Sequence, residues 1–450
     1  MSRVPIGSHE LRILVETVKL AEELKPSQQA KRMVFRKYKI IGTEKDRVLT
    51  ALFYDIMKRL GIIDKIISDV TGISNILILD PWLRAALRVA VDLLLFNKVS
   101  NTLKNLLKWK VADYISSMTH PYVGMYYWEV FDKISSYELR PRSKDEELEF
   151  KYLLPLWLIS KIKEIVRSDE EMRKLLQAFN TKLPLSIRIN ILKTNVNDIF
   201  KELEREGKKP RISLRVPTII KFEGPYDFDN SKLFREGKII IQEEAAAVAS
   251  LILGPKPGET IIDMCAAPGG KSEHMAELMK NKGKIYAFDI DKLRIKRMKQ
   301  LLRRSGISIV KIYEEDVNKA PKILGEEIAD RVMLDVPCTA SGTLMKNPEL
   351  RWRLRPGDIE EITKLQYKLL ETAIKLVRPG GVILYCTCSI FPEENEDLIR
   401  KILKKHNELR LVPIKDPYLE GFLPGTMRAW PHKHETIGFF YALLKKKDRA

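Results

Sequence analysis

The chain has 450 residues, of which 45% are hydrophobic and 31% carry a charge, so it is long enough for two or three soluble domains. Lysine and arginine number 79 against 60 aspartates and glutamates, which gives a net charge of +19. Such an excess is typical of proteins that bind RNA or DNA, although a generally basic surface explains it equally well. The N-terminus lacks the apolar core of a signal peptide, and acidic and basic residues with a proline interrupt the longest apolar stretch, which excludes a membrane span.

Cysteine usage restricts the compartment and the metal chemistry. The chain has only four cysteines, and none lies before residue 265, so a disulfide framework is not indicated. The spacing Cys386-Thr-Cys388 is not that of a zinc site, and no histidine pair accompanies it. We therefore expect a cytoplasmic protein that holds no metal.

The N-terminal part of the chain predicts helices throughout. From about Glu10 to about Met125, apolar residues recur at spacings of three and four. The best examples are the segments 28–38, 46–60 and 80–96, and Gly42, Gly61 and Gly72 punctuate them. Pro81 behind Asp80 is a usual helix start. An all-helical domain over residues 1–140 is predicted.

A smaller mixed domain is predicted next. The polar, proline-containing segment 140–148 is expected to be a linker. A helix follows at 154–165, and strands at 185–191 and 218–222 flank a helix at 197–206. Residues 150–235 therefore predict a small α+β domain, of a kind that often presents RNA along its sheet.

The rest of the chain, residues 236–450, is organised around one stretch. Residues 260–264 have strand character, Pro268, Gly269 and Gly270 form a tight turn, and a helix starts near Glu273. Strand, glycine turn and helix are the opening of a nucleotide-binding β-α-β unit. Further strands are expected at 284–290, 311–313, 331–336 and 381–386. The pattern predicts a Rossmann-like, doubly wound sheet.

Acidic residues mark the ends of successive strands in this domain. Asp289 ends the second strand, where a carboxylate can accept both hydroxyls of a ribose. Asp316 and Asp335 stand at the ends of the third and fourth. Acids at these positions suit an adenosyl ligand without phosphates, such as S-adenosylmethionine, better than a nucleotide phosphate.

Two cysteines also follow strands, and both are expected to reach the same edge of the sheet. They are Cys338, after Asp335-Val-Pro, and Cys388, after Tyr385-Cys-Thr. A thiolate there is a strong nucleophile, and methylation of cytosine at carbon 5 needs one to add at carbon 6. A protonated carboxyl such as Asp335 can assist at N3 of the ring. Cys386 points to the opposite face and is expected in the core. From the residues alone, either of the other two thiols can be the nucleophile.

Several long motifs carry a family resemblance. Residues 263–271, 335–342, 385–395 and 428–440 resemble the Sun/Fmu family of S-adenosylmethionine-dependent RNA (cytosine-5)-methyltransferases. The resemblance runs from about Leu154 to the C-terminus, and members often carry a NusB-like helical RNA-binding domain, which residues 80–95 also resemble. One departure is Ile437, where many relatives have Asp, which puts a peripheral contact in doubt.

The resemblance implies roles for individual residues. Cys388 is the nucleophile, Cys338 assists release of the methylated product, and Asp335 contacts the substrate base or methyl donor. Arg294 is expected to add to the cofactor pocket. The implied cofactor contacts are Cys265, Ala266, Ala267, Pro268, Gly269, Gly270, Lys271, Asp289, Asp316 and Asp335.

A few other residues keep two interpretations. Trp352 either stacks near a flipped base or packs, and packing is favoured; Arg351 and Arg353 are candidates for phosphate contacts. His432 and His434 either contact RNA phosphate or belong to the C-terminal strand pairing. His274 is expected to be solvated or structural, and Cys265 to support the turn.

We therefore predict a monomeric RNA cytosine-5 methyltransferase. Ribosomal RNA is the expected substrate, and tRNA is the second candidate. A protein of another class, a non-catalytic RNA-binding factor for ribosome assembly, is an alternative that the intact cysteines and glycine turn disfavour. Methylation of DNA is disfavoured by the Thr-Cys-Ser motif, because DNA enzymes place the nucleophile in Pro-Cys.

Overall fold

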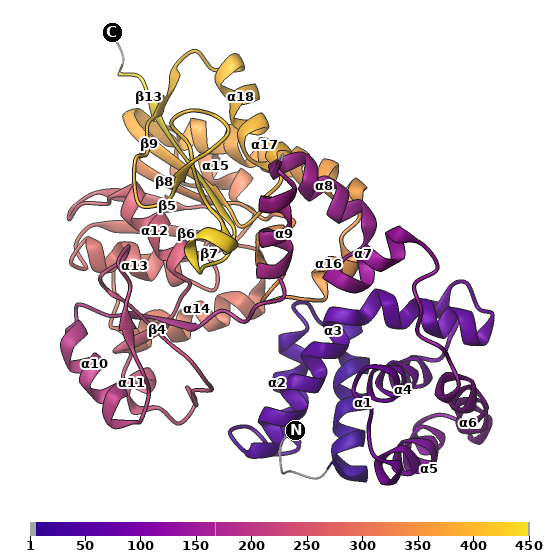
Figure 1. Ribbon diagram of the computed structural model, residues 1–450. Helices are drawn as coiled ribbons and strands as arrows, with labels where there is room; N and C mark the ends of the chain where they lie inside the picture. The colour runs from indigo at the N-terminus through magenta and orange to yellow at the C-terminus, as the bar shows by residue number, and fades with distance from the viewer. Residues whose placement is uncertain (1–5, 167, 449–450) are drawn as a thin grey trace. The chain divides into compact units, whose positions relative to one another are not determined.

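The structure is a computed structural model that describes residues 6–166 and 168–448. By its internal contacts the chain divides into two compact units (Figure 1). The smaller unit comprises Met1–Asp169 together with Lys346–Arg353. The larger unit comprises Glu170–Met345 and Leu354–Ala450.

The smaller unit is built from helices, as the apolar spacing predicts. They pack around one core of leucine, isoleucine and valine side chains that also includes Phe53 and Tyr127. The helices are α1 (Ser8–Glu23), α2 (Gln28–Lys37), α3 (Glu44–Thr71), α4 (Pro81–Val91), α5 (Asn101–Met118), α6 (Pro121–Ser135), α7 (Lys144–Tyr152) and α8 (Leu156–Val166), with the short α16 (Leu350–Arg353) added from later in the chain. A 3₁₀ turn (Ile76–Ile78) precedes α4, and a π-helical turn (Asp92–Phe96) follows it. Among the described residues, no helix is both long and apolar enough to cross a membrane.

Local chemistry explains where these helices begin and end. The Asp80 side chain accepts the N–H groups of Trp82 and Leu83 at the start of α4. Gly72 ends α3 in the left-handed conformation, with φ of 73°. Gly61, in contrast, was expected to punctuate the chain, but α3 runs through it. A Cβ on Gly61 would lie 2.1 Å from the Trp352 ring, so this glycine serves a close approach and not a turn.

The predicted linker at 140–148 is partly wrong. Helix α7 begins at Lys144, inside that segment. The Ser143 side chain accepts the N–H of Glu146, and three acids occupy the first turn, where the helix dipole favours negative charge. The charge run that indicates a linker is therefore a helix start.

The first part of the larger unit is a small α+β region, as predicted. Its strands form an antiparallel sheet in the order β2-β3-β1-β4, with Ile187, Ile220 and Ile239 in its core. The strands are β1 (Leu185–Ile189), β2 (Arg211–Ile212), β3 (Ile219–Phe222) and β4 (Ile239–Ile241), and the helices are α9 (Asp169–Ala178), α10 (Val196–Arg205) and α11 (Lys232–Arg235).

A mixed, mostly parallel sheet forms the centre of the larger unit. Its strand order is β11-β12-β13-β9-β8-β5-β6-β7, and β10 pairs with β13. Strands β9, β8, β5, β6 and β7, which are neighbours in this order, are all parallel to one another, whereas β13 is antiparallel to β9. The strands are β5 (Thr260–Asp263), β6 (Lys284–Asp289), β7 (Val310–Glu314), β8 (Ala329–Asp335), β9 (Val377–Thr387), β10 (Leu409–Val412), β11 (Leu419–Glu420), β12 (Met427–Ala429) and β13 (Phe439–Lys446).

Helices cover both faces of this sheet, so adjacent strand residues enter different cores. On β8, Leu334 packs in the core that contains α17 and α18, whereas Met333 packs in the core that contains α12 and α13. This alternation is the period of two of a strand, and the doubly wound prediction is confirmed. The helices are α12 (Glu244–Leu253), α13 (Gly270–Leu278), α14 (Lys292–Ser305), α15 (Ala320–Leu324), α17 (Pro356–Leu376), α18 (Glu396–Lys405) and α19 (Pro431–His434).

Candidate active site

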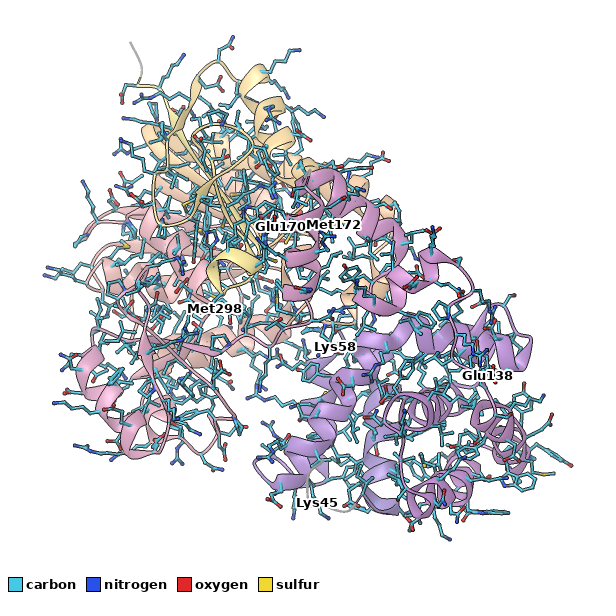
Figure 2. All side chains as sticks on the ribbon, in the orientation of Figure 1. Lys45, Lys58, Glu138, Glu170, Met172 and Met298 are labelled. Atoms are coloured by element: carbon cyan, nitrogen blue, oxygen red, sulfur yellow. The ribbon has the colours of Figure 1, made fainter. Side chains whose placement is uncertain are left out.

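The glycine turn joins β5 to α13 and lies against two neighbouring elements. The Ala266 N–H donates to the carbonyl of Phe288 at 2.9 Å, at the end of β6. Gly269 has φ of +99°, and a Cβ there would lie 2.6 Å from Cγ of Met298 on α14. Met298 is labelled among the side chains in Figure 2. The backbone of the turn, residues 265–271, is thus held at the carboxyl edge of the sheet, where ligands of doubly wound folds bind.

Asp289 and Arg294 hold the same turn from β6 and α14. The two oxygens of the Asp289 carboxylate accept the N–H groups of Ala267, at 3.0 Å, and Asp291, at 2.9 Å. Arg294 donates from its guanidinium to the Ala267 carbonyl. The structure therefore brings Arg294 to the turn as a support for its backbone.

Asp316 lies at the end of the neighbouring strand. It follows β7, which pairs with β6, and its side chain accepts the N–H of Asn318 at 2.9 Å to cap a 3₁₀ turn. The cap fixes the carboxylate, whose remaining lone pairs stay available to a ligand.

An ammonium–carboxylate pair links the glycine turn to β8. Nζ of Lys271 lies 2.6 Å from Oδ2 of Asp335; the Lys271 side chain is largely buried, and that of Asp335 is partly buried. Burial is the largest single influence and lowers the pKa of Lys271, but Asp335 and the other acidic groups around the ammonium together outweigh it and raise that pKa above its ordinary value. The other Asp335 oxygen lies 3.5 Å from Sγ of the fully buried Cys386.

The two predicted thiols meet at the ends of β8 and β9. These strands are parallel, and their register sets Asp335 opposite Cys386, so the residues that follow emerge side by side. The sulfur atoms of Cys338 and Cys388 are 3.1 Å apart. The hydrogen bond with Cys388, together with burial, raises the pKa of Cys338 well above its ordinary value. Cys338 is thereby held as a neutral thiol beside the sulfur of Cys388.

One buried carboxylate, which the sequence reasoning did not single out, joins the loops of both cysteines. Glu394 accepts the N–H of Thr339 at 3.0 Å and its hydroxyl at 2.5 Å. It also accepts the hydroxyl of Ser389 at 2.5 Å and the amide of Gln366 at 2.8 Å. Thr339 and Ser389 directly follow Cys338 and Cys388, so Glu394 fixes the separation of the sulfur atoms. The signal in the sequence is an acid between Pro392 and Asn395 in a motif that already carries the resemblance.

Two glycines bring the same loops into backbone contact. The Gly342 N–H donates to the Cys388 carbonyl at 2.9 Å, and the Gly438 N–H donates to the Gly342 carbonyl at 2.8 Å. A Cβ on Gly342 would lie 2.4 Å from the Gly438 carbonyl oxygen. Both glycines belong to the motifs of the resemblance, but composition alone does not reveal that they touch.

A further carboxyl lies buried at the end of β5. Asp263 accepts the Ser272 hydroxyl at 2.5 Å, and its other oxygen is buried without a hydrogen-bond partner. Burial raises the pKa of Asp263 to about 7. The group is placed to support the turn from beneath.

The acids and the turn fit an adenosyl cofactor without phosphates. Asp289 and Asp316 present carboxylates, which accept from hydroxyl and amino groups and repel phosphate. Lys271, the cation of the turn, is already paired with Asp335 and so is not a free phosphate anchor. The donor set therefore agrees with S-adenosylmethionine and disagrees with a nucleoside phosphate.

Arg351, Trp352 and Arg353 all belong to the smaller unit, and each has a hydrogen-bond partner within it. The Trp352 indole donates to the Lys58 carbonyl at 2.8 Å and packs, as favoured. Arg351 is fully buried and donates to the Leu153 carbonyl, so the proposed phosphate contact is wrong for it. Arg353 is partly buried, and it donates to the Ala21 carbonyl at 2.5 Å, so its guanidinium already has a partner within the smaller unit.

His274, His432 and His434 are held within the larger unit. His274 is buried on α13, and burial lowers its pKa well below the ordinary value, so the solvated alternative is wrong. His434 is buried, and its Nδ1 accepts the Trp430 N–H at 2.8 Å. His432 lies 3.0 Å from the carboxylate of Glu171. Neither of the last two presents a free ring to a phosphate. Within the described residues, no group of histidine, cysteine and acidic side chains has the arrangement of a metal site.

Comparisons with known proteins match the parts of the chain that build this site. The family described as 16S rRNA methyltransferase RsmB/F matches residues 250–445, and the RsmF/B-like ferredoxin-like domain matches residues 154–229. A relative from Synechocystis, named "Probable ribosomal RNA small subunit methyltransferase B", is 36% identical over 300 residues, which are 66% of this chain and 67% of that protein.

Solved structures resemble the chain as well. The crystal structure of PH0851 has a TM-score of 0.95 and 56% sequence identity, and it covers 99% of this chain and 100% of its own. A methyltransferase homolog from Pyrococcus horikoshii has a TM-score of 0.60 and 30% identity, and it covers 67% of this chain and 98% of its own. The chain therefore belongs to the RsmB/F family of 16S rRNA methyltransferases, which are S-adenosylmethionine-dependent enzymes that form 5-methylcytosine.

Proposed function

We propose that this protein methylates carbon 5 of a cytosine in small-subunit ribosomal RNA, with Cys388 as the nucleophile. The observation that carries the proposal is the 3.1 Å separation of the Cys338 and Cys388 sulfur atoms beside the glycine turn. Two thiols in contact at the ligand-binding edge of the sheet suit a reaction in which one sulfur adds to the base and the other acts on the adduct.

S-adenosylmethionine, when bound, supplies the methyl group on a sulfonium. The residues that would hold it are the turn from Cys265 to Lys271 and the strand-end acids Asp289 and Asp316, with Asp335 nearest the substrate base. Arg294 supports the turn through its bond to Ala267. Gly269 and Gly270 leave backbone open to close approach.

Cys388 is assigned to the bond with carbon 6, and Cys338 to the release step. As a thiolate, Cys388 adds to carbon 6, which makes carbon 5 electron-rich enough to accept a methyl group. Cys338, whose pKa is raised by its hydrogen bond to Cys388 and by burial, stays protonated and in contact with the reacting sulfur. Solvent water takes the carbon 5 proton, the electrons of that bond restore the carbon 5–carbon 6 double bond, and the Cys388 sulfur leaves as a thiolate that accepts a hydrogen bond from the Cys338 thiol. The proton at N3 returns to Asp335, so the product is a neutral 5-methylcytosine.

The Lys271–Asp335 pair is assigned to the ring nitrogen. Addition at carbon 6 places negative charge on the pyrimidine, and a proton delivered at N3 neutralises it. Asp335 is assigned to this proton, and the Lys271 ammonium 2.6 Å away holds its carboxyl group in position. We also assign the base to a flipped-out conformation, because a stacked base cannot reach the cysteine edge.

The test uses the wild type, Cys388→Ala and Cys338→Ala with a small-subunit rRNA transcript, a tRNA pool and duplex DNA, each with labelled cofactor. Label in 5-methylcytosine of the rRNA alone is expected for the wild type. A denaturing gel should show a covalent RNA adduct for Cys338→Ala, and none for Cys388→Ala.

Other outcomes are equally informative. Label in tRNA would identify tRNA as the substrate, and label in duplex DNA would identify the protein as a DNA methyltransferase. The reverse adduct pattern would make Cys338 the nucleophile. Cofactor binding absent by calorimetry, with RNA still bound, would leave a non-catalytic RNA-binding factor.

The domain roles belong to the same proposal. Residues 1–140 are assigned to a NusB-like RNA-binding domain, 150–235 to a small domain that binds or links RNA, and 236–450 to catalysis. We propose a cytoplasmic monomer. The net charge of +19 supports contact with a polyanion over much of the surface.

A further inference from the structure

An open cavity lies away from the cysteine edge, where the small sheet region of the larger unit meets the C-terminal end of α14. Its volume is about 440 Å³. It is lined by Asp229, Phe234, Arg235, Gln300, Arg303 and Arg304. Nothing in the catalytic arrangement uses these residues.

The two walls of this cavity are fastened to each other. The buried amide of Asn190 donates to the Gly237 carbonyl at 2.9 Å on one wall and to the Ser305 carbonyl at 3.1 Å on the other. Nζ of Lys193 bridges the carbonyls of Glu236 and Arg304 in the same way. The cavity is therefore preformed, and a ligand would not have to order its walls.

The Arg304 guanidinium is held in this cavity by stacking on the aromatic ring of Phe234. Its guanidinium carbon lies 3.8 Å from the centre of the Phe234 ring. Its Nε is buried and has no hydrogen-bond partner in the structure. Burial lowers the pKa of Arg304, and the charge of the nearby Glu273 opposes this without reversing it. An anion near the guanidinium would relieve the unfavourable burial.

The surroundings are strongly basic. Seven of the 14 residues of α14 are lysine or arginine, and none is acidic. Asp229 is the acid among the lining residues, and it already has a partner of its own. A simpler interpretation is that Arg303 and Arg304 only complement the dipole at the end of α14. Lys193 already satisfies the Arg304 carbonyl there, however, so the arginine side chains are not needed for that purpose.

We propose that this α11–α14 cavity binds a backbone phosphodiester of the RNA substrate. The fork of a guanidinium matches two phosphate oxygens, and the set of three arginines against one acid favours an anion. Arg294, at the glycine turn, is ten residues before Arg304 on the same helix, which is about 15 Å along the axis. The cavity thus anchors the strand a few nucleotides from the reacting base. This inference rests on the proposed RNA substrate.

The experiment measures binding of the full chain to a small-subunit rRNA transcript between about 50 and 200 mM salt. Arg303→Gln and Arg304→Gln are compared with Lys299→Gln, which removes one charge from the same helix outside the cavity. Each arginine variant should weaken binding severalfold and reduce the slope of log affinity against log salt by about 0.7, as loss of one phosphate contact does. Lys299→Gln should leave the slope nearly unchanged. Arg303 is exposed, so its variant folds even if Arg304→Gln does not.

Two results would overturn the inference. An equal slope change in Lys299→Gln would mean general basicity, and unchanged slopes in the arginine variants would mean that the cavity serves an acidic protein or nothing. Failure of the proposed chemistry is separate, because cofactor binding and the Cys338→Ala adduct are measured independently of the salt slope.

Discussion

The connection between β8 and α17 has two halves, and each half belongs to a different unit of the structure. Residues 336–345 remain in the larger unit, where Cys338 lies in contact with Cys388 and Glu394 binds the next residue. Residues 346–353 belong to the smaller unit, where the Glu349 carboxylate accepts the buried N–H of Ser27 at 2.8 Å. One half carries groups of the reaction, and the other half completes a helical core.

Composition alone is misleading for the arginines of the second half. The second half, with two arginines and a tryptophan, has the composition of an RNA contact, whereas the first half has no charged residue. Burial reverses this interpretation, since Arg351 is fully enclosed and burial lowers its pKa to about 9. Basic and aromatic residues indicate a nucleic-acid surface only when they are exposed.

The largest effect is expected in the chemistry of the first half. Cys388→Ala should lower methyl transfer at least about ten-thousandfold, because the base then lacks a nucleophile. Cofactor affinity and the thermal unfolding of both units should stay as in the wild type. Methyl incorporation and calorimetry measure these. Substantial residual transfer by this variant would assign the attack to another group.

A substitution in the second half should lower the free energy of unfolding of the smaller unit. Trp352→Ala removes a ring that packs against Gly61 and a hydrogen bond to Lys58, so we expect a loss of about 3 kcal/mol in the smaller unit. Trp109→Ala is the control, because that side chain is 54% exposed, and it should cost about 1 kcal/mol or less. Urea unfolding with cofactor binding as a second readout separates the units. Equal losses in the two variants would contradict the packing role of Trp352.

A smaller effect, on turnover, should follow from adding a methyl group at Gly342 in the first half. In Gly342→Ala the new methyl would lie 2.8 Å from the Cys388 carbonyl, so the nucleophile shifts and turnover should fall about a hundredfold. Gly357→Ala has open space around its Cβ and should be neutral. Steady-state kinetics compares the two. Normal turnover in Gly342→Ala would show that the loop relaxes freely.

The smallest effect concerns pH and the larger unit. The pKa of Asp263 is raised from 3.8 to about 7, so between these values the folded state holds a proton that the unfolded state has released. Stability contributed by this proton is present at low pH and is lost as pH rises through about 7, by about 2 kcal/mol from pH 5 to pH 7. Unfolding of Asp263→Asn should lack this part of the pH dependence. Parallel curves for the wild type and the variant would refute the assignment.

Most of the larger unit was predictable from its sequence. The apolar runs place β5, β6 and β8 within two residues of their observed ends, and acids and cysteines at strand ends indicate the ligand edge. The helical spacing of the N-terminal part was equally informative. The resemblance of that part to NusB stays a prediction. The predictions were wrong where a residue type can serve two purposes. Glycine often ends a helix, but Gly61 lies within α3 and allows the Trp352 ring to approach.

The sequence by itself determined the elements, the sheet that they form and the chemistry of its edge, because periodicity and strand-end residues are local properties. The tertiary structure decided which thiol lies against which, that Glu394 joins both cysteine loops, and that residues 346–353 pack with the helices. These facts depend on contacts between residues far apart in the chain. Burial and partners, which set the charge and position of each group, exist only once those contacts form.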